Sequence, residues 1–375
     1  MIASILGVGT SSFGKQPHLH PAELAWAAVA EALEQAGDGP EIDAVYVGTV
    51  FGAPGVAQRA LHALGIVDVP ILTIENACAS GTSAFHESVH AVASGRFERV
   101  LALGIEKMTD AFDGPIIPEP TDTEGRSGLA LPALYAMSAS RYLAKHDVTR
   151  DDLAAVAVKN HANGTLNPRA QKQRRRSIDD VLDSRMIAEP LTLLQCCPIA
   201  DGAAAAVIGP PGSGGDGSVG VRSSVLRSGG LWDHRSDAAW GFELVRHTAE
   251  LAYTEAGIQA DDIDVLECHD AFTIGEIVTT EALGLAETGQ GAALVRDGTT
   301  SLGGSTPVNP SGGLLARGHP LGATGLAQVA EICWQLTDRA GERQVADASI
   351  GVVETMGGGV AGVDGNACVI AVLER

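Results

Sequence analysis

The stretch "AELAWAAVAEALEQAGDGPEIDAVYVG", residues 22–48, decides the fold, because the chain runs through the same order of elements a second time. Apolar residues at helical spacing end at Ala36 and Gly37, and an acidic turn then leads into an apolar strand. Residues 242–269, "FELVRHTAELAYTEAGIQADDIDVLECH", follow the same order about 220 residues later. The repeated order predicts two tandem halves of one α/β fold.

A second pair of segments supports the duplication. Residues 78–104 pass from a turn of small residues through a helix to a strand, and residues 319–336 with 348–359 do the same. Strands that alternate with helices predict parallel sheets covered by helices, with the chemistry at the carboxyl ends of the strands. Irregular, Gly- and Pro-rich stretches at 113–128 and 209–220 suggest breaks. We expect an N-terminal half (1–105 and 196–212), an insertion (106–195) and a C-terminal half (213–375).

The composition limits the class of protein. The 46 acidic residues outnumber the 25 basic ones and give a net charge of -21, which argues against nucleic acid or an anionic membrane as the main partner. We see no stretch with the ~20 apolar residues of a membrane span and no signal-peptide pattern at the start. The 6 cysteines are too few and too irregularly spaced for a disulfide framework, so we expect a cytoplasmic protein.

Cys78 is the first candidate catalytic residue. It lies between a predicted strand, "VPILTI", and a predicted helix, so its thiol would lie at a helix N-terminus. Unpaired backbone N–H groups and the helix dipole favour an anion there, which predicts a lowered pKa and a reactive thiolate. The alternative is a small buried hydrophobic residue, because free cysteines are common in protein cores.

Two histidines and a glycine run could serve that cysteine. His319 follows Gly318 in a loop and could take the thiol proton, and the repeat places it on the turn related to that of Cys78. His269 ends a predicted strand, where its ring N–H could donate to an oxyanion, and Asp270 would cap the next helix or orient a partner. The glycines at 357–359 bring bare backbone N–H groups close to a ligand.

Together these motifs resemble the thiolase superfamily, most closely its sterol-carrier-protein-type branch. The resemblance is carried by "NACASG" (76–81), "NHANGTLNPRAQ" (160–171), "CCPIADGAAA" (196–205), "HDAF" (269–272), "GHPLGATG" (318–325) and "MGGGVAG" (356–362). It implies a duplicated, five-layered α/β/α/β/α fold with an insertion loop domain, at least a homodimer, and a coenzyme A thioester as substrate.

The resemblance also implies a role for each site residue. Cys78 would be the acylated nucleophile and His319 the group that activates it. His269 would help His319 to polarise the second substrate, and the N–H groups of Gly357 and Cys78 would hold the oxyanion. The implied activity is that of an acyl-CoA C-acyltransferase, a thiolase that cleaves or forms a 3-ketoacyl-CoA.

The chain departs from the family pattern where a second cysteine acts as acid and base, because Thr355 and Ala271 occupy the two positions that can supply it. Neither side chain is a proton base near neutral pH. A histidine could take over, or the enzyme could use decarboxylative condensation or retro-aldol cleavage instead. A non-catalytic scaffold for a small OB-fold and zinc-ribbon partner is a further alternative. We expect no metal cofactor, because neither Cys196 with Cys197 nor His86 with His90 has further ligands nearby in the sequence.

Overall fold

The computed structural model describes the chain apart from residues 38, 40, 115, 117–120, 216 and 234–238. A mixed sheet in the order β3-β2-β4-β7-β1-β8-β11-β10-β9 forms its centre. Its strands are β1 (Ala3–Thr10), β2 (Ala44–Gly48), β3 (Ile71–Ile74), β4 (Val100–Lys107), β7 (Asp201–Gly209), β8 (Val219–Arg227), β9 (Val265–Glu267), β10 (Ile350–Gly357) and β11 (Ala367–Glu374). The helices are α1 (Pro21–Ala36), α2 (Val56–Ala63), α3 (Ser80–Ala93), α4 (Met108–Ala111), α5 (Thr123–Arg126), α6 (Leu131–Lys145), α7 (Arg150–Gly164), α8 (Ile178–Leu182), α9 (Phe242–Ala256), α10 (Thr273–Ala282), α11 (Gly291–Arg296), α12 (Gly313–Arg317) and α13 (Leu321–Leu336).

The sheet is built from two similar halves that meet at the antiparallel pair of β1 and β8. Outward from this pair, β1-β7-β4 and β8-β11-β10 are antiparallel, and the next strands, β2 and β9, run parallel to their neighbours. This order confirms the duplication. The expectation of parallel sheets was wrong for the middle of the sheet, because an antiparallel strand such as β11 follows β10 after a short loop and needs no crossover helix.

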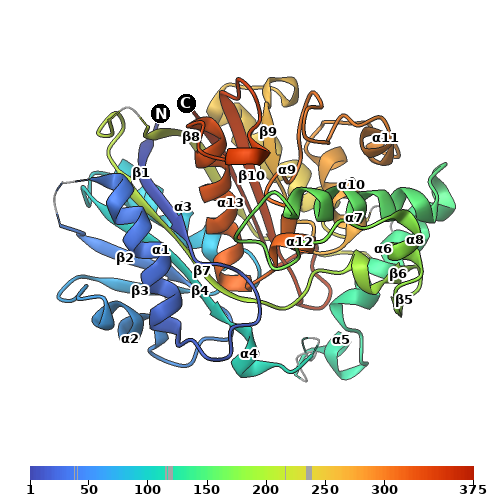
Figure 1. The fold of residues 1–375 in the computed structure, drawn as a ribbon, viewed down its shortest axis with the longest axis horizontal. Coiled ribbons are helices and arrows are strands. Elements are labelled where there is room, and N and C mark those ends of the chain that lie inside the picture. Colours follow the sequence, from blue (N-terminus) through green and yellow to red (C-terminus); the bar gives the residue numbers. More distant parts are fainter. Residues whose placement is uncertain (38, 40, 115, 117–120, 216, 234–238) are drawn as a thin grey trace.

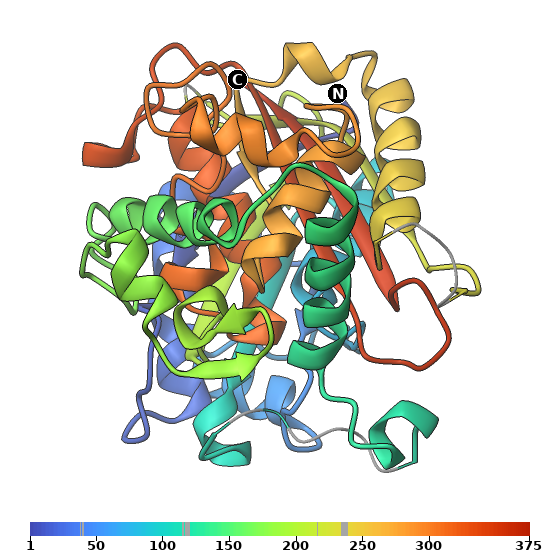
Figure 2. The same cartoon turned by 90° about the vertical axis from the view of Figure 1, so that its right-hand side faces the viewer.

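Helices cover both halves of the sheet and separate them (Figures 1 and 2). Helices α1 and α2 pack on the outer face of the first half, and α9 and α10 pack on the outer face of the second. Helices α3 and α13 lie between, because their apolar side chains share one core with strands of both halves. The five predicted layers, α/β/α/β/α, are confirmed.

Helices α3 and α13 approach one another through glycines. A methyl group on Gly81 would lie 2.5 Å from the carbonyl oxygen of Gly322, and one on Gly325 would overlap Thr82. Larger side chains at these positions would push the helices apart. The close contact matters for function, because both helices begin at the candidate site.

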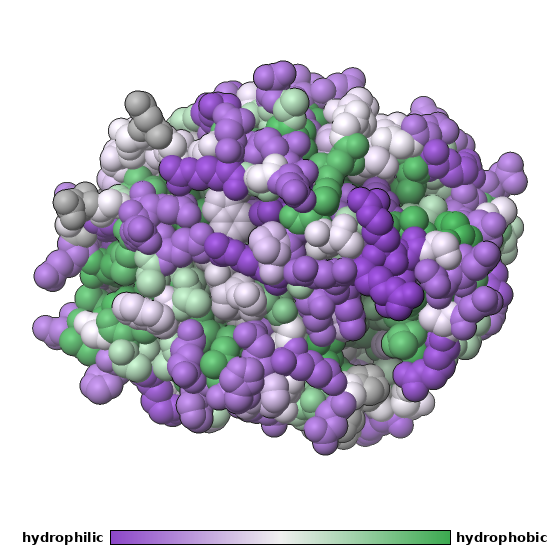
Figure 3. Space-filling model, in the orientation of Figure 1, coloured by the Kyte–Doolittle hydropathy of each residue, from purple (hydrophilic) through white to green (hydrophobic). Residues whose placement is uncertain are grey.

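The segment between β4 and β7 stands to one side of the sheet, where α6, α7, α8 and the small hairpin β5 (Met186–Ala188) and β6 (Leu191–Thr192) gather (Figure 1). Five residues of the irregular stretch 113–128 lie outside the described residues. The face in Figure 3 is mainly hydrophilic, as the charged composition predicts. Within the described part of the chain, every helix is too short or too polar to cross a membrane.

Candidate active site

Cys78 lies in a tight turn between β3 and α3. Ala79 is the N-cap of α3, so Cys78 is the residue directly before the cap. The backbone reaches it through Ala77, whose φ of 49° falls in the left-handed region that residues with a Cβ rarely adopt. The Ser80 hydroxyl accepts from the N–H of Asn76 at 2.9 Å and donates to the carbonyl of Ala77, which fixes the turn. Such local strain is typical of functional turns.

His319 has the matching place in the second half. Pro320 is the N-cap of α13, so His319 also directly precedes a helix cap. Gly318 has a φ of 109°, which only glycine adopts without strain, and turns the chain into the loop. The predicted equivalence of the turns of Cys78 and His319 therefore holds in the structure, with α12 rather than a strand before the second one.

The structure brings Cys78, His319 and His269 together. A ligand atom from each of the three lies within 4.8 Å of the other two, and all three side chains are buried. The rings of His269 and His319 meet edge to face, with centroids 5.1 Å apart. His269 follows β9, and its backbone N–H donates to Glu354 at 2.8 Å. Three distant parts of the sequence thus form one cluster.

Thr324 sets the orientation and tautomer of His319. Its hydroxyl lies 3.0 Å from the Pro320 carbonyl, which can only accept, and 2.7 Å from Nδ1 of His319. The hydroxyl therefore donates to Pro320 and accepts from Nδ1–H, which leaves Nε2 without a proton. Nε2 is buried and has no hydrogen-bond partner among the described residues. This nitrogen is available as a base.

Burial keeps the three groups uncharged. Desolvation raises the pKa of Cys78 to about 12. The hydrogen bond from the Gly358 amide acts in the opposite direction and does not offset this rise. Desolvation also lowers the pKa of His269 to about 3 and, with His269 and Arg317 nearby, that of His319 well below 6.5. The expectation of a lowered cysteine pKa was wrong, because the thiol is removed from water and the helix terminus does not compensate. For Cys78 to act as a nucleophile, a base would have to remove the thiol proton.

The backbone around the sulfur comes from the glycine run after β10. The N–H of Gly358 and that of Cys78 itself are directed at the sulfur. Gly357 packs against the turn, where a methyl group would overlap the carbonyl of Asn76. The sequence indicated the whole run 357–359 and the resemblance singled out Gly357, whereas the N–H directed at the sulfur from this run is that of Gly358.

The sulfur lies against apolar side chains. Cys78 packs with Met108 and Leu321, which are buried, and with partly buried neighbours. Those neighbours are Val50, Phe112, Ile116 and Ile199. On the side of the histidines, a cavity of about 20 Å³ lies between α6 and α10 and is lined in part by His269. Ser138 and Val278 line both this cavity and a larger one of about 220 Å³. The smaller space holds about one water molecule.

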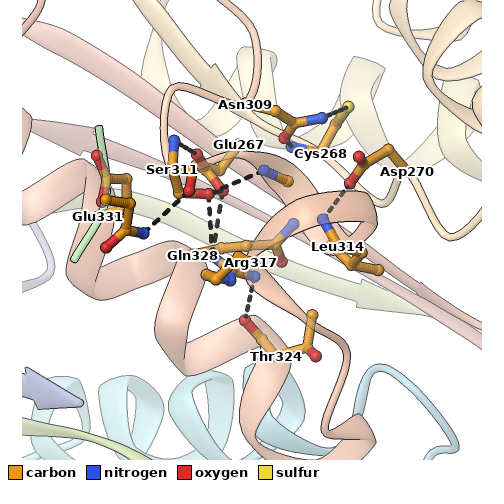
Figure 4. Close-up of polar contacts among 12 residues, drawn as sticks. Glu267, Cys268, Asp270, Asn309, Ser311, Leu314, Arg317, Thr324, Gln328 and Glu331 are labelled. Atoms are coloured by element: carbon orange, nitrogen blue, oxygen red, sulfur yellow. Dashed lines mark hydrogen bonds and ion pairs between the residues drawn. The ribbon is translucent and has the colours of Figure 1, made fainter. Parts of the chain in front are cut away.

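Figure 4 shows a buried polar network of residues that lie near the two histidines in the sequence, among them Glu267, Asp270 and Arg317. Arg317 pairs with Glu267 at 3.3 Å, and the Ser311 hydroxyl donates to the same carboxylate at 2.8 Å. Asp270 accepts from the N–H of Leu314 at 2.6 Å and so caps α12, which means that, of the two roles expected for it, capping of α10 was wrong. The cap of α10 is Phe272, without a side-chain hydrogen bond. The network thus ties the loop of His269 to the segment that ends at His319.

Sequence reasoning also missed Glu106, which joins the two halves beside the site. Its carboxylate accepts from the N–H groups of Val50, Phe51 and Gly322, at 2.9, 3.0 and 3.0 Å. Burial raises the pKa of this carboxyl to about 6. A signal was present, because a charged residue inside the apolar strand "VLALGIEK" needs buried partners.

The remaining candidates do not join the cluster. Thr355 is buried and its hydroxyl donates to Gln328. The backbone N–H of Cys197 donates to the carbonyl of Ala271 at 2.9 Å, which places that cysteine beside the histidine loop. His86 and His90 both contact Ser224 on β8, and their side chains are partly buried or exposed. A further histidine, His161, is buried on α7 and also lies outside the cluster.

Comparison with known proteins identifies the family. The profile described as "Thiolase, N-terminal domain" matches residues 5–210, and that described as "Thiolase C-terminal domain-like" matches residues 231–370. The chain belongs to the thiolase family. An acetyl-CoA acetyltransferase of Methanothermobacter thermautotrophicus is 40% identical to this thiolase-family chain, over 95% of the chain and 96% of the relative. Human sterol carrier protein 2 is 36% identical, over 94% of the chain and 69% of the relative.

Solved structures confirm the thiolase fold. A thiolase from Ascaris suum in complex with coenzyme A matches all of the chain with a TM-score of 0.73 at 19% identity, over 99% of the matched chain. The structure titled "Ltp2-ChsH2(DUF35) aldolase" matches with a TM-score of 0.85 at 23% identity, over 98% of the matched chain. The names of the acetyl-CoA acetyltransferase relatives support an acyltransferase in general.

Proposed function

We propose that the chain is a thiolase-type acyl-CoA C-acyltransferase that cleaves or forms a 3-ketoacyl-CoA through an acyl intermediate on Cys78. The observation that carries this proposal is the buried cluster in which atoms of Cys78, His269 and His319 lie within 4.8 Å of one another. A thiol next to an unprotonated imidazole is the arrangement that nucleophilic catalysis requires. The names of the acetyl-CoA acetyltransferase relatives support a coenzyme A thioester as substrate.

In the proposed reaction, Nε2 of His319 removes the thiol proton as the sulfur attacks the thioester carbonyl. The bond from the carbonyl carbon to the coenzyme A sulfur then breaks, and the leaving thiolate takes up a proton. The N–H groups of Cys78 and Gly357, with that of Gly358 beside them, stabilise the oxyanion. In the second half-reaction, His319, which keeps on Nε2 the proton taken from the thiol while the coenzyme A thiolate is protonated from solvent, polarises the thioester oxygen of the incoming substrate together with a ring N–H of His269.

Decarboxylative condensation is the second candidate, and Thr355 favours it. The Thr355 hydroxyl is engaged with Gln328 and offers no base for the α-carbon. A thiolase would then have to use a histidine for that proton transfer, whereas loss of carbon dioxide forms the carbanion without a base. Retro-aldol cleavage needs no acyl-cysteine, and a non-catalytic scaffold needs no reactive cluster, so both lack a use for Cys78.

The family resemblance supports further proposals about assembly. We propose a homodimer or higher oligomer in the cytoplasm, with a small OB-fold and zinc-ribbon protein as an additional partner. We also propose the division into 1–105 with 196–212, 106–195 and 213–375. Light scattering of the purified chain, alone and with a co-encoded small protein, checks the assembly.

Intact-mass measurement tests the acyl intermediate. The chain is mixed with acetyl-CoA, and we expect a gain of one acyl group that disappears in Cys78→Ala. Cys197→Ala is the matched control and should keep the adduct. Failure to form an adduct, or its survival in Cys78→Ala, would contradict the proposal. Cleavage of 3-ketoacyl-CoA substrates then supports the thiolase, and condensation from a malonyl donor without such cleavage supports the second candidate.

A further inference from the structure

We propose that Cys78, His269 and His319 also form a binding site for a divalent cation of the zinc type. An ion held there occupies the sulfur and both imidazoles at once. Binding itself depends on the geometry of the cluster, and only the resulting inhibition rests on the proposed function. From the sequence we expected no metal cofactor, because pairs of residues close together in the chain, such as His86 and His90, lack further ligands nearby in the sequence. The three ligands proposed here come from separate parts of the chain.

The distances suit a zinc ion. Tetrahedral zinc, with bonds of about 2.0–2.3 Å to nitrogen and sulfur, places its ligand atoms about 3.3–3.8 Å apart. The three atoms already lie within 4.8 Å of one another. Side-chain rotations that move the ligand atoms by about 1 Å therefore bring all three into bonding distance of one ion. A fourth position on the ion remains for water or a substrate atom.

His319 is oriented as a metal ligand is. The Thr324 hydroxyl binds Nδ1 of His319 at 2.7 Å, so Nε2 faces the cluster as a free ligand atom. A hydrogen bond to the second ring nitrogen is the usual support of a zinc-bound histidine. Nδ1 of His269 and Nε2 of His319 are buried and lack hydrogen-bond partners in the described part of the chain. A cation would satisfy at least the second of these nitrogens.

The donor types decide which cation fits. One sulfur and two imidazole nitrogens favour Zn²⁺ or Co²⁺, whereas Mg²⁺ prefers oxygen ligands, which the cluster does not supply. The nearby cation Arg317 is paired with Glu267, and the carboxylates of Glu106 and Glu75 act on the sulfur as negative charges. The thiol proton passes to solvent as the ion binds, because the thiolate is the ligand form.

Titration with Co²⁺ tests the site without measuring activity, because a cobalt–thiolate bond has its own charge-transfer absorption. We expect binding of one ion per chain, loss of that absorption in Cys78→Ser and at least about 10-fold weaker binding in His269→Ala. Cys197→Ser and His90→Ala are matched controls and should bind as the unaltered chain does. Absence of the thiolate band, or its persistence in Cys78→Ser, overturns the proposal.

A second measurement uses the unaltered chain, so that it does not depend on how a variant folds. Alkylation of Cys78 by iodoacetamide, followed by peptide mass spectrometry, should slow at least about 10-fold with Zn²⁺ and remain unchanged with Mg²⁺. An equal rate in both solutions overturns the inference. Cobalt binding without an acyl adduct contradicts the proposed function alone, and an acyl adduct without cobalt binding contradicts the cation site alone.

Discussion

The two sides of the candidate site differ in kind. Cys78 lies against apolar side chains, with Met108 and Leu321 buried beside it. His269 and His319 belong to segments that are held by buried charged groups, among them Glu267 and Arg317. The thiol thus lies in surroundings that disfavour charge, while the histidine loops are attached to surroundings full of hydrogen bonds and ion pairs.

The contrast separates two tasks. The apolar side keeps the thiol neutral, because desolvation raises the pKa of Cys78 to about 12, and in the proposed function a base then removes its proton. The polar side fixes the backbone that carries the base, through the Asp270 cap on α12 and the Arg317 pair. Glu106 connects the two sides, since it accepts from Gly322 in the second half and from Val50 in the first.

The largest effect should follow from removing the base. His319→Ala leaves a buried thiol that cannot lose its proton, so we expect Cys78 acylation by acetyl-CoA to slow roughly 10³-fold. Rapid-quench mass spectrometry measures this rate. His90→Ala, which changes a histidine on the outer part of α3, should leave it unchanged. A loss of less than about 10-fold in His319→Ala would mean that burial does not make the thiol dependent on this base.

Breaking the polar side should cost stability. Arg317→Met leaves Glu267 buried without its cation, and we expect the free energy of unfolding to fall by about 3–5 kcal/mol in urea titrations. Adding Glu267→Gln should recover part of that loss. Arg246→Ala removes exposed pairs with Glu243 and Glu250 and should cost less than about 1 kcal/mol. Equal effects of the two arginine variants would show that the network is not structurally special.

His161 allows the effect of burying a histidine to be measured away from the candidate site. This histidine lies outside the cluster, and desolvation lowers its pKa to about 4, with Arg176 and Lys172 adding to the effect. Its contribution to stability is complete above pH 6.5 and is lost as the pH falls toward 4, because the unfolded chain takes up the proton first. Between pH 7 and 4.5, the free energy of unfolding of His161→Leu should therefore fall by about 2–3 kcal/mol less than that of the unaltered chain. Identical pH dependence in urea titrations would contradict this.

The smallest effect concerns the orientation of the base. Thr324→Val removes the hydroxyl that accepts from Nδ1–H of His319, and we expect kcat/KM to fall about 10- to 100-fold. Thr324→Ser keeps the hydroxyl and should restore most of the rate. If Thr324→Ser is as impaired as Thr324→Val, the methyl group matters through packing and the hydrogen bond does not set the tautomer.

The sequence predicted the fold well because its signals are local. Helical spacing that stops at Gly37 and again at Gly257 placed α1 and α9 within one or two residues. Antiparallel pairing of β7 and β11 was missed, because strand direction depends on where a short loop returns the chain. The periodicity of a strand does not contain that information.

The candidate site was predicted in its members and missed in its electrostatics. Cys78 and His319 could be chosen because the repeat relates their two turns, and His269 because it ends a predicted strand. The sequence predicted a lowered pKa for Cys78, whereas burial raises it. How deeply the thiol is buried depends on Met108 and Leu321, which belong to other segments of the chain. Thr324 was overlooked although its partners, His319 and Pro320, are near in the sequence, because which hydroxyl meets a ring nitrogen depends on how the turn folds.

The central claim is that a neutral, buried thiol is activated by the unprotonated Nε2 of His319. A crystal structure of the chain after brief exposure to an acyl-CoA tests it most directly. We expect an acyl group on Sγ of Cys78, with a ring nitrogen of His319 within hydrogen-bond reach, about 3 Å, of the reacting atoms. An unmodified Cys78, or an acyl group on another residue with His319 turned away, would contradict it.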